Sequence, residues 1–243
     1  MQQYGTATMS TRQWGGVLIG HLFDLQDWTE ELVAPHDPWV EKWEIGGTPR
    51  VLLRSVGFAQ IEDGMVVFET AKLLTKRLNG AFATLRRGQP LAVEGVAERR
   101  PDGSIGQHTI FAVGSAQVRA RAGSLSALPV GPTEVQQWLQ LAQENNLVED
   151  LLIHQSEPAN WYDLWKSYEV IRKLCGGQHE LTKRPWSPPK AKLENFGHTA
   201  NSYRHSLAHS SREALPQNPM PIDEAKELIR TMADKLLQQM ARP

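Results

Sequence analysis

The hydrophobic pattern of this chain changes its periodicity across one short segment, residues 122–132. Before this segment, apolar residues occur in short or alternating runs typical of β-strands, whereas after it they recur every three or four positions, as in helices. The segment itself consists mainly of small residues, glycine and proline, a composition typical of an interdomain linker. We therefore predict an α+β fold, with a β-rich domain at residues 1–121 and an all-α helical bundle at residues 133–243.

The β-rich domain is expected to be sandwich-like, with one or two helices among its strands. Short apolar runs predict strands at residues 17–19, 50–54, 65–68 and 91–96. The sequence Arg-Pro-Asp-Gly-Ser at 100–104 predicts a turn, because proline presets φ and glycine accepts positive φ. This turn should join strands at 91–99 and 107–121 in a hairpin. Apolar residues at helical spacing predict helices at 22–33 and 71–87.

The second domain is expected to contain about four helices. Thr133 is a suitable N-cap for the first, since its hydroxyl accepts a hydrogen bond from a first-turn N–H. An apolar stripe after Pro158, ended by the glycines at 176–177, predicts the second. Because of its prolines, the loop 178–189 cannot be helical over its whole length. The remaining two helices are predicted at 191–209 and from Pro221 to Leu236.

Bulk composition narrows the possible classes of protein. The 243 residues carry a formal net charge of −1, so no overall attraction to RNA or anionic lipid is expected. No run approaches the roughly 20 apolar residues of a membrane-spanning helix, and the N-terminal sequence lacks the build of a secretion signal. The single cysteine, Cys175, is expected to be a small buried side chain. We expect a soluble, cytoplasmic protein with no membrane partner.

Residues suited to chemistry are concentrated late in the third predicted helix of the second domain, between positions 198 and 210. His198, His205 and His209 fall within a narrow angular band at roughly 100° per residue, which places them on one polar face. Basic residues outnumber acidic ones between positions 166 and 212. Any contact with RNA is therefore expected in this locally positive region rather than over the whole chain.

The run from Tyr203 to His209, Tyr-Arg-His-Ser-Leu-Ala-His, resembles the signature motif of the HEPN superfamily: an arginine, a polar residue, a short variable stretch and a histidine. Arg204 matches the arginine, His205 the polar follower and His209 the terminal histidine. Active members of that superfamily are metal-independent endoribonucleases, commonly dimeric, with a composite site where two copies meet. The resemblance covers the C-terminal domain alone. It implies RNA as substrate, a homodimer, and no metal or cofactor.

These residue types suit the cleavage of RNA by its own 2′-hydroxyl. Histidine exchanges protons near neutral pH, which assigns His209 as acid and base. Arginine offers a charged bidentate fork to the phosphate, which assigns Arg204. Accessory candidates are polar neighbours on this helix and an acidic residue on the preceding one: His205, Asn201, His198 and Glu169. Positions five apart lie roughly 140° apart on an ideal helix, so the long arginine side chain, a helix end or a second subunit must bring Arg204 and His209 together.

Two other readings of these residues remain open from the sequence. His205 and His209 stand at i and i+4, with His198 two turns away, which is a spacing that suits a zinc ion; no further cysteine or glutamate ligand accompanies them. Alternatively, the histidines line a solvated face, Arg204 pairs with Glu169, and the domain is a non-catalytic interaction or dimerisation module.

Two further features near the motif are given structural roles. A second match, from Arg172 to His179, is set aside because Lys173 is not the favoured polar follower and the glycines at 176–177 break the helix. Three aromatic residues at helical spacing are expected to pack in the core rather than to stack on bases: Trp161, Trp165 and Tyr168.

The motif also suggests a biological setting. Segments 199–202 and 218–220 resemble parts of uncharacterised bacterial helical proteins, which favours a bacterial origin without indicating an activity. An unrestrained ribonuclease would injure its own cell. We therefore expect a toxin or an antiviral defence effector, in which the first domain senses a signal or restrains the second.

Overall fold

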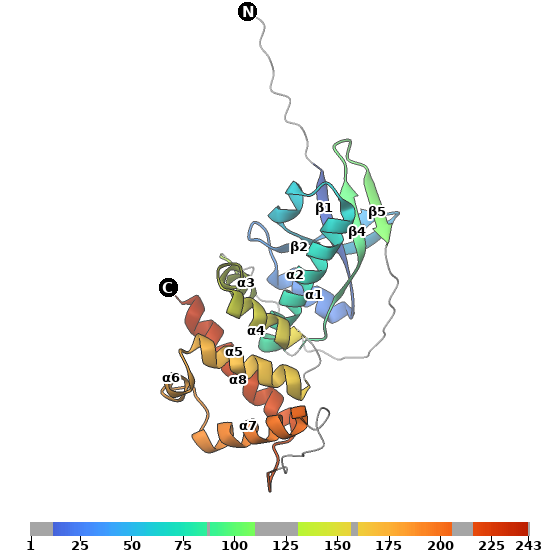
Figure 1. The fold of residues 1–243 in the computed structure, drawn as a ribbon. Helices are drawn as coiled ribbons and strands as arrows, with labels where there is room; N and C mark the ends of the chain where they lie inside the picture. Colours follow the sequence, from blue (N-terminus) through green and yellow to red (C-terminus); the bar gives the residue numbers. More distant parts are fainter. Residues whose placement is uncertain (1–11, 87, 110–130, 157–159, 206–215, 243) are drawn as a thin grey trace, which may run out of the picture. The chain divides into compact units, whose positions relative to one another are not determined.

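The computed structural model of the protein divides into two compact units (Figure 1). The sheet unit comprises Met1–Thr75 and Leu91–Thr133, and the helical unit comprises Lys76–Pro90 and Glu134–Pro243. The structure describes residues 12–86, 88–109, 131–156, 160–205 and 216–242. Most of the predicted linker, residues 122–132, lies outside the described ranges. The α+β prediction is confirmed in this coarse form.

The sheet unit contains one curled, antiparallel sheet with the strand order β2-β3-β1-β4-β5. Its strands are β1 Gln13–Ile19, β2 Trp39–Ile45, β3 Thr48–Arg54, β4 Ala92–Arg99 and β5 Ile105–Thr109. The predicted hairpin is confirmed as β4 and β5, and Gly103 in its turn has a φ of +83°. Residues 110–121 of the predicted second strand lie outside the described ranges. Because all strands of the described ranges belong to this one sheet, the sandwich-like arrangement is not confirmed.

Two longer helices and one short 3-10 helix accompany the sheet: α1 Leu22–Glu31, α2 Gly64–Arg86 and η1 Val56–Gln60. Both helices predicted for this region are confirmed as α1 and α2. The first half of α2 approaches β1 so closely that a Cβ on Gly16 would lie 2.8 Å from the Cβ of Ala71. The close approach of helix and strand explains a glycine at this strand position.

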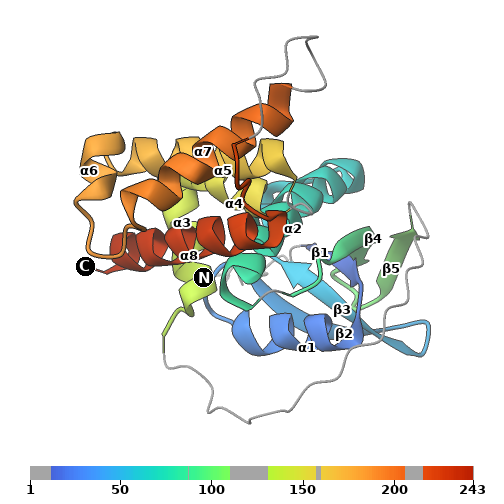
Figure 2. The ribbon, with the colours of Figure 1, turned by 90° about the horizontal axis from the view of Figure 1, so that it is seen from below.

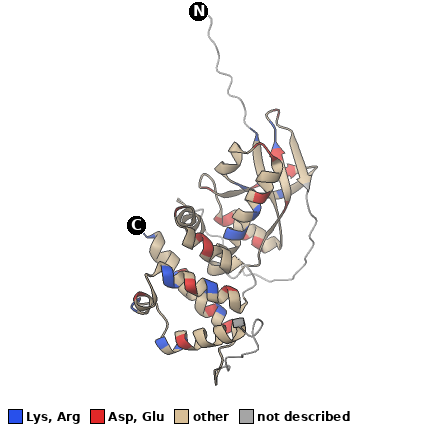
Figure 3. Cartoon of the chain, in the orientation of Figure 1, with Lys and Arg blue, Asp and Glu red and all other residues tan. Residues whose placement is uncertain are grey.

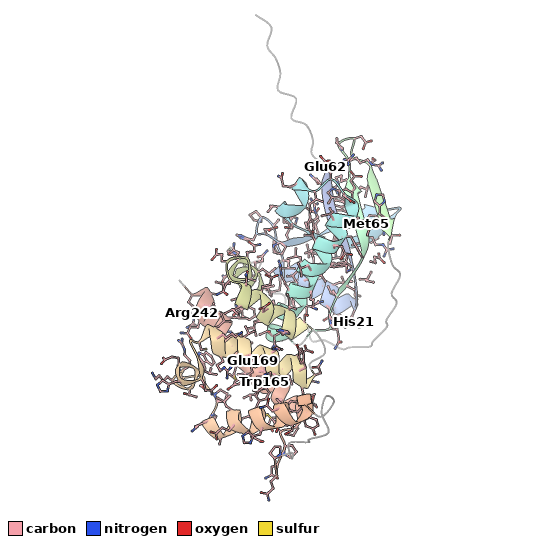
Figure 4. All side chains as sticks on the ribbon, viewed as in Figure 1. His21, Glu62, Met65, Trp165, Glu169 and Arg242 are labelled. Carbon is pink, nitrogen blue, oxygen red and sulfur yellow. The ribbon has the colours of Figure 1, made fainter. Side chains whose placement is uncertain are left out.

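Residues 65–68, predicted as a strand, instead form the first turn of α2. Asp63 caps this turn, because its Oδ1 accepts a hydrogen bond from the backbone N of Met65 at 2.8 Å. Val67 and Phe68 are buried, whereas the two residues before them are exposed (Met65 is labelled in Figure 4). Periodicity alone does not separate a strand from a helix in so short an apolar run, and the prediction was wrong.

The sheet face turned away from α2 holds a buried arginine between aromatic rings. The Arg54 guanidinium carbon lies 5.4 Å from the ring centre of Trp39 and 4.9 Å from that of Trp43, and Arg54 donates a hydrogen bond to Glu41. Arg54 is 8% exposed. Burial lowers the pKa of Arg54, and the Glu41 carboxylate opposes this shift. Trp43 also belongs to a small apolar cluster with Val17, Leu52 and Ala97.

We expect Arg54→Ala to lower the free energy of unfolding by about 2 kcal/mol, because the change removes two cation–π contacts and the packed arginine stem. Arg54→Met should lower the free energy of unfolding by less than about 1 kcal/mol, since an apolar side chain of similar length fills the space between the rings. Urea unfolding followed by tryptophan fluorescence measures both losses. Equal losses in the two variants would contradict a packing role for Arg54.

The helical unit is organised around α5, Trp161–Leu174, which contacts α4, α6, α7 and α8 (Figure 2). The other helices are α3 Glu134–Glu144, α4 Asn146–Ser156, α6 Gln178–Thr182, α7 Lys190–His205 and α8 Ile222–Ala241. The four predicted helices are confirmed as α3, α5, α7 and α8, whereas α4 and α6 were not predicted. No helix within the described ranges has both the length and the apolar content of a membrane span.

Residues 76–90, which include the second half of α2, belong to the helical unit. The sequence had placed them in the first domain. The packing of α2 against α4 explains their place in the helical unit. A Cβ added to Gly80 would lie 1.8 Å from the carbonyl oxygen of Leu152, so the two helices touch backbone to backbone. Arg77 forms an ion pair with Glu149 beside this contact. Glycine at position 80 permits this close packing.

Candidate functional site

The helix α7 carries most of the residues that the sequence motif singles out. His198 and Asn201 lie in its second half with described side chains. Arg204 and His205 occupy its last turn, but their side chains are outside the described part of the chain. His209 lies outside the described residues altogether, so the predicted meeting of Arg204 and His209 stays a prediction.

The alternative readings of the motif also stay predictions. No group of three metal-ligating side chains occurs within the described part of the chain, but the side chains of His205 and His209 fall outside it. Glu169, labelled on α5 in Figure 4, forms an ion pair with Lys166 on the same helix, with 2.9 Å between Oε2 and Nζ. Its expected pairing with Arg204 is not tested.

A pocket of about 690 Å³ opens between α5, α6 and α7, within the range of small-molecule sites. Each helix contributes residues of one face to its wall. From α5 come Trp165, Tyr168 and Arg172, and from α6 come Gln178, His179 and Thr182. From α7 come Lys190, Leu193, Glu194, Gly197, His198 and Asn201.

The aromatic wall of this pocket is held by packing between α5 and α7. Trp165 stacks on Phe196 with ring centres 6.4 Å apart and planes 16° apart, and Tyr168 meets the same ring edge-on at 5.4 Å. The sequence favoured a purely structural role for these aromatic residues. The packing role is confirmed, and Trp165 and Tyr168 additionally line the pocket.

The charge of the pocket lining is predominantly positive. Arg172 and Lys190 contribute cations, His179 and His198 contribute imidazoles, and Glu194 contributes the acid (Figure 3 shows the charged residues of these helices). Lys190 forms an ion pair with Glu194, with 3.5 Å between Nζ and Oε1. Arg172 forms no ion pair with any residue of the described ranges. The lining therefore favours an anionic ligand. Arg172 and His179, which do not form a motif in the sequence, thus line the same pocket.

The pocket face of α7 continues toward the motif arginine. The lining positions 190, 194, 197 and 201 follow each other at steps of four, three and four residues, which is one face of a helix. The next positions of this series are 204 and 205, which α7 includes. On an ideal helix, positions 204 and 205 come next on this face, one turn beyond position 201.

Two other features offer less chemistry. A pocket of about 370 Å³ lies where α3 meets the end of α8, with a lining that contains no aromatic ring: Glu134, Gln137, Gln238, Ala241 and Arg242. Cys175 is buried, as expected from the sequence. Burial raises the pKa of its thiol, although Arg184 opposes this effect. The protonated thiol is a poor nucleophile.

A comparison of the chain with protein-family models, with curated proteins and with solved structures finds no match. The resemblance to the HEPN superfamily therefore depends on the residues from Arg204 to His209. The pocket that precedes them on α7 is a separate observation, because it follows from helix packing and not from the motif.

Proposed function

We propose that the helical unit is a metal-independent endoribonuclease of HEPN type, which binds RNA in the pocket between α5, α6 and α7 and cleaves it with Arg204 and His209. The observation that carries this proposal is the shared face of α7. A cationic, aromatic-walled pocket lies along it at positions 190 to 201, and helix periodicity makes position 204 the next in the same series. Aromatic rings and cations together suit the bases and phosphates of a single strand.

The proposed reaction uses the substrate's own nucleophile. The ribose 2′-hydroxyl attacks the adjacent phosphorus while His209 accepts its proton, and the 5′-oxygen of the next nucleotide leaves with a proton from the protonated imidazole. Arg204 stabilises the additional negative charge on the phosphorane oxygens. The products carry a 2′,3′-cyclic phosphate and a 5′-hydroxyl. Asn201, His198 and His205 orient the RNA along α7.

The proposed assembly is a homodimer, in which the composite site brings Arg204 of one copy to His209 of the other. A shared site removes the need for one helix to bring together Arg204 and His209, which lie roughly 140° apart around its axis. We also propose that the protein is a bacterial toxin or antiviral defence effector. The sheet unit then senses the activating signal or restrains the nuclease.

The test incubates the chain of 243 residues with labelled single-stranded RNA in the presence of a chelator. We expect cleavage, with products that end in a cyclic phosphate. The protein with His209→Ala is the control, because a contaminating nuclease would cleave in both preparations. Binding without cleavage would support the non-catalytic module instead. Cleavage that requires added zinc would support the metal-binding alternative.

A further inference from the structure

One corner of the pocket is organised around a single hydroxyl group. The Tyr168 hydroxyl donates a hydrogen bond to Oε1 of Gln178 at 2.6 Å. Burial is the largest influence on the pKa of Tyr168 and raises it, while Gln178 and the nearby charge of Arg172 oppose the shift. The hydroxyl therefore keeps its proton and remains the donor. The Gln178 amide is held by its oxygen, which leaves its NH₂ group to donate.

Gly197 keeps the space beside the Trp165 ring open. A Cβ at this position would meet Cζ3 of Trp165 at 3.9 Å, which is ordinary contact. Both residues line the pocket, so the absence of a side chain at position 197 leaves room beside the indole. The pocket thus combines the apolar ring of Trp165 with a polar corner, where the Gln178 amide and the Arg172 guanidinium offer N–H donors.

We propose that this pocket holds one unpaired nucleotide of a single-stranded RNA, with its base against Trp165 and its phosphate at Arg172 and Gln178. The choice of RNA as the ligand rests on the function proposed above. Stacking on an aromatic ring tolerates every base, so the pocket selects unpaired strands and not a particular sequence. A base within a duplex is held in its stack and does not reach such a pocket without being extruded.

Binding is measured on the full chain with His209→Ala, so that bound RNA is not cleaved. The probes are a short, fluorescently labelled single-stranded RNA of mixed sequence and the duplex of the same sequence. Loss of one stacked base changes affinity by about 10-fold or more. We therefore expect the single strand to bind at least about 10-fold more tightly than the duplex. Equal affinities, or no binding of the single strand, would overturn the proposal.

Two substitutions locate the nucleotide. Gly197→Leu fills the space beside Trp165 and should weaken binding of the single strand by about 10-fold or more. Ala191→Leu is the matched control, because Ala191 is exposed on the same helix outside the pocket lining. Leucine favours a helix at both positions, and thermal unfolding checks that both variants fold. Equal affinities of the two variants would contradict binding beside Trp165.

Tyr168→Phe tests the polar corner with little change in packing. The ring that meets Phe196 is retained, while the hydroxyl that holds Gln178 is lost. We expect RNA binding to weaken by about 3- to 10-fold, the effect of one hydrogen bond, with no decrease in melting temperature beyond that of Ala191→Leu. An unchanged affinity would contradict the placement of the phosphate at Arg172 and Gln178.

The two proposals fail in different ways. Single-strand binding that Gly197→Leu abolishes, without cleavage by the wild-type protein, would support the nucleotide pocket and contradict the ribonuclease. Cleavage by the wild-type protein, with undiminished binding in Gly197→Leu, would contradict the nucleotide pocket and leave the ribonuclease standing.

Discussion

Replacing His209 with alanine should slow RNA cleavage by about 10²- to 10⁴-fold, the usual contribution of a general acid or base. Arg204→Ala should slow it by about 10²- to 10³-fold, because a positioned donor to the phosphorane is lost. Single-turnover rates with labelled RNA measure both effects. His154→Ala is the matched control, since His154 lies on α4 outside the pocket lining. An unchanged rate in either of the first two variants would contradict the role assigned to that residue.

Mixing the two inactive variants tests whether the site is shared between subunits. In a heterodimer of Arg204→Ala and His209→Ala, one composite site keeps an intact Arg204 from one copy and an intact His209 from the other. We therefore expect cleavage to return after the variants are mixed and allowed to exchange subunits. Continued inactivity of the mixture would contradict the composite site and require both groups to act from one chain.

The second large effect is on stability: Gly80→Ala should lower the free energy of unfolding of the helical unit by roughly 2–3 kcal/mol. The new Cβ would lie 1.8 Å from the Leu152 carbonyl oxygen, so α2 and α4 must move apart. Overpacking costs about 1–3 kcal/mol and occasionally more, and a collision with a backbone atom belongs at or above the upper end of this range. About 2–3 kcal/mol therefore remains after the gain in helix propensity of about 1 kcal/mol. Thermal unfolding should show a melting temperature lower by roughly 5–10 °C.

Gly197→Ala is the control for this prediction. Position 197 also lies in a helix of the helical unit, but a Cβ there would make only an ordinary van der Waals contact with the Trp165 ring, at 3.9 Å. The same substitution should therefore stabilise the protein by about 0.5–1 kcal/mol, because alanine loses less backbone freedom than glycine. Opposite signs for the two glycines are expected. A stabilising effect at both positions would contradict the backbone contact between α2 and α4.

The long helices were predictable because their apolar residues repeat over several turns. The stripe after Pro158 became α5, and the acidic start after Pro221 became α8. The turn at 100–104 was equally clear, because proline and glycine impose local backbone geometry. Each of these signals lies within one element and needs no partner to be recognised.

Short elements and shared elements were not predictable in the same way. β2 was not predicted, since its sequence WVEKWEI includes three charged residues, and only Val40 and Trp43 of this strand are buried. Its pairing with β3 places it in the sheet. Residues 65–68 are apolar enough for either a strand or a helix, and the cap by Asp63 decides for the helix. No local pattern reveals that α2 contributes to both units, because that depends on the fit of Gly80 against Leu152.

By itself, the sequence determined the α+β character of the chain, the periodic helices and the motif from Arg204 to His209, because these are properties of residues close together in the chain. Only the tertiary structure decided that Arg172, His179 and Lys190 line one pocket, to which the motif helix contributes a wall. Those residues come from three helices, and their convergence depends on how α5, α6 and α7 pack. Packing depends on contacts between residues distant in sequence, and periodicity and composition carry no information about such contacts.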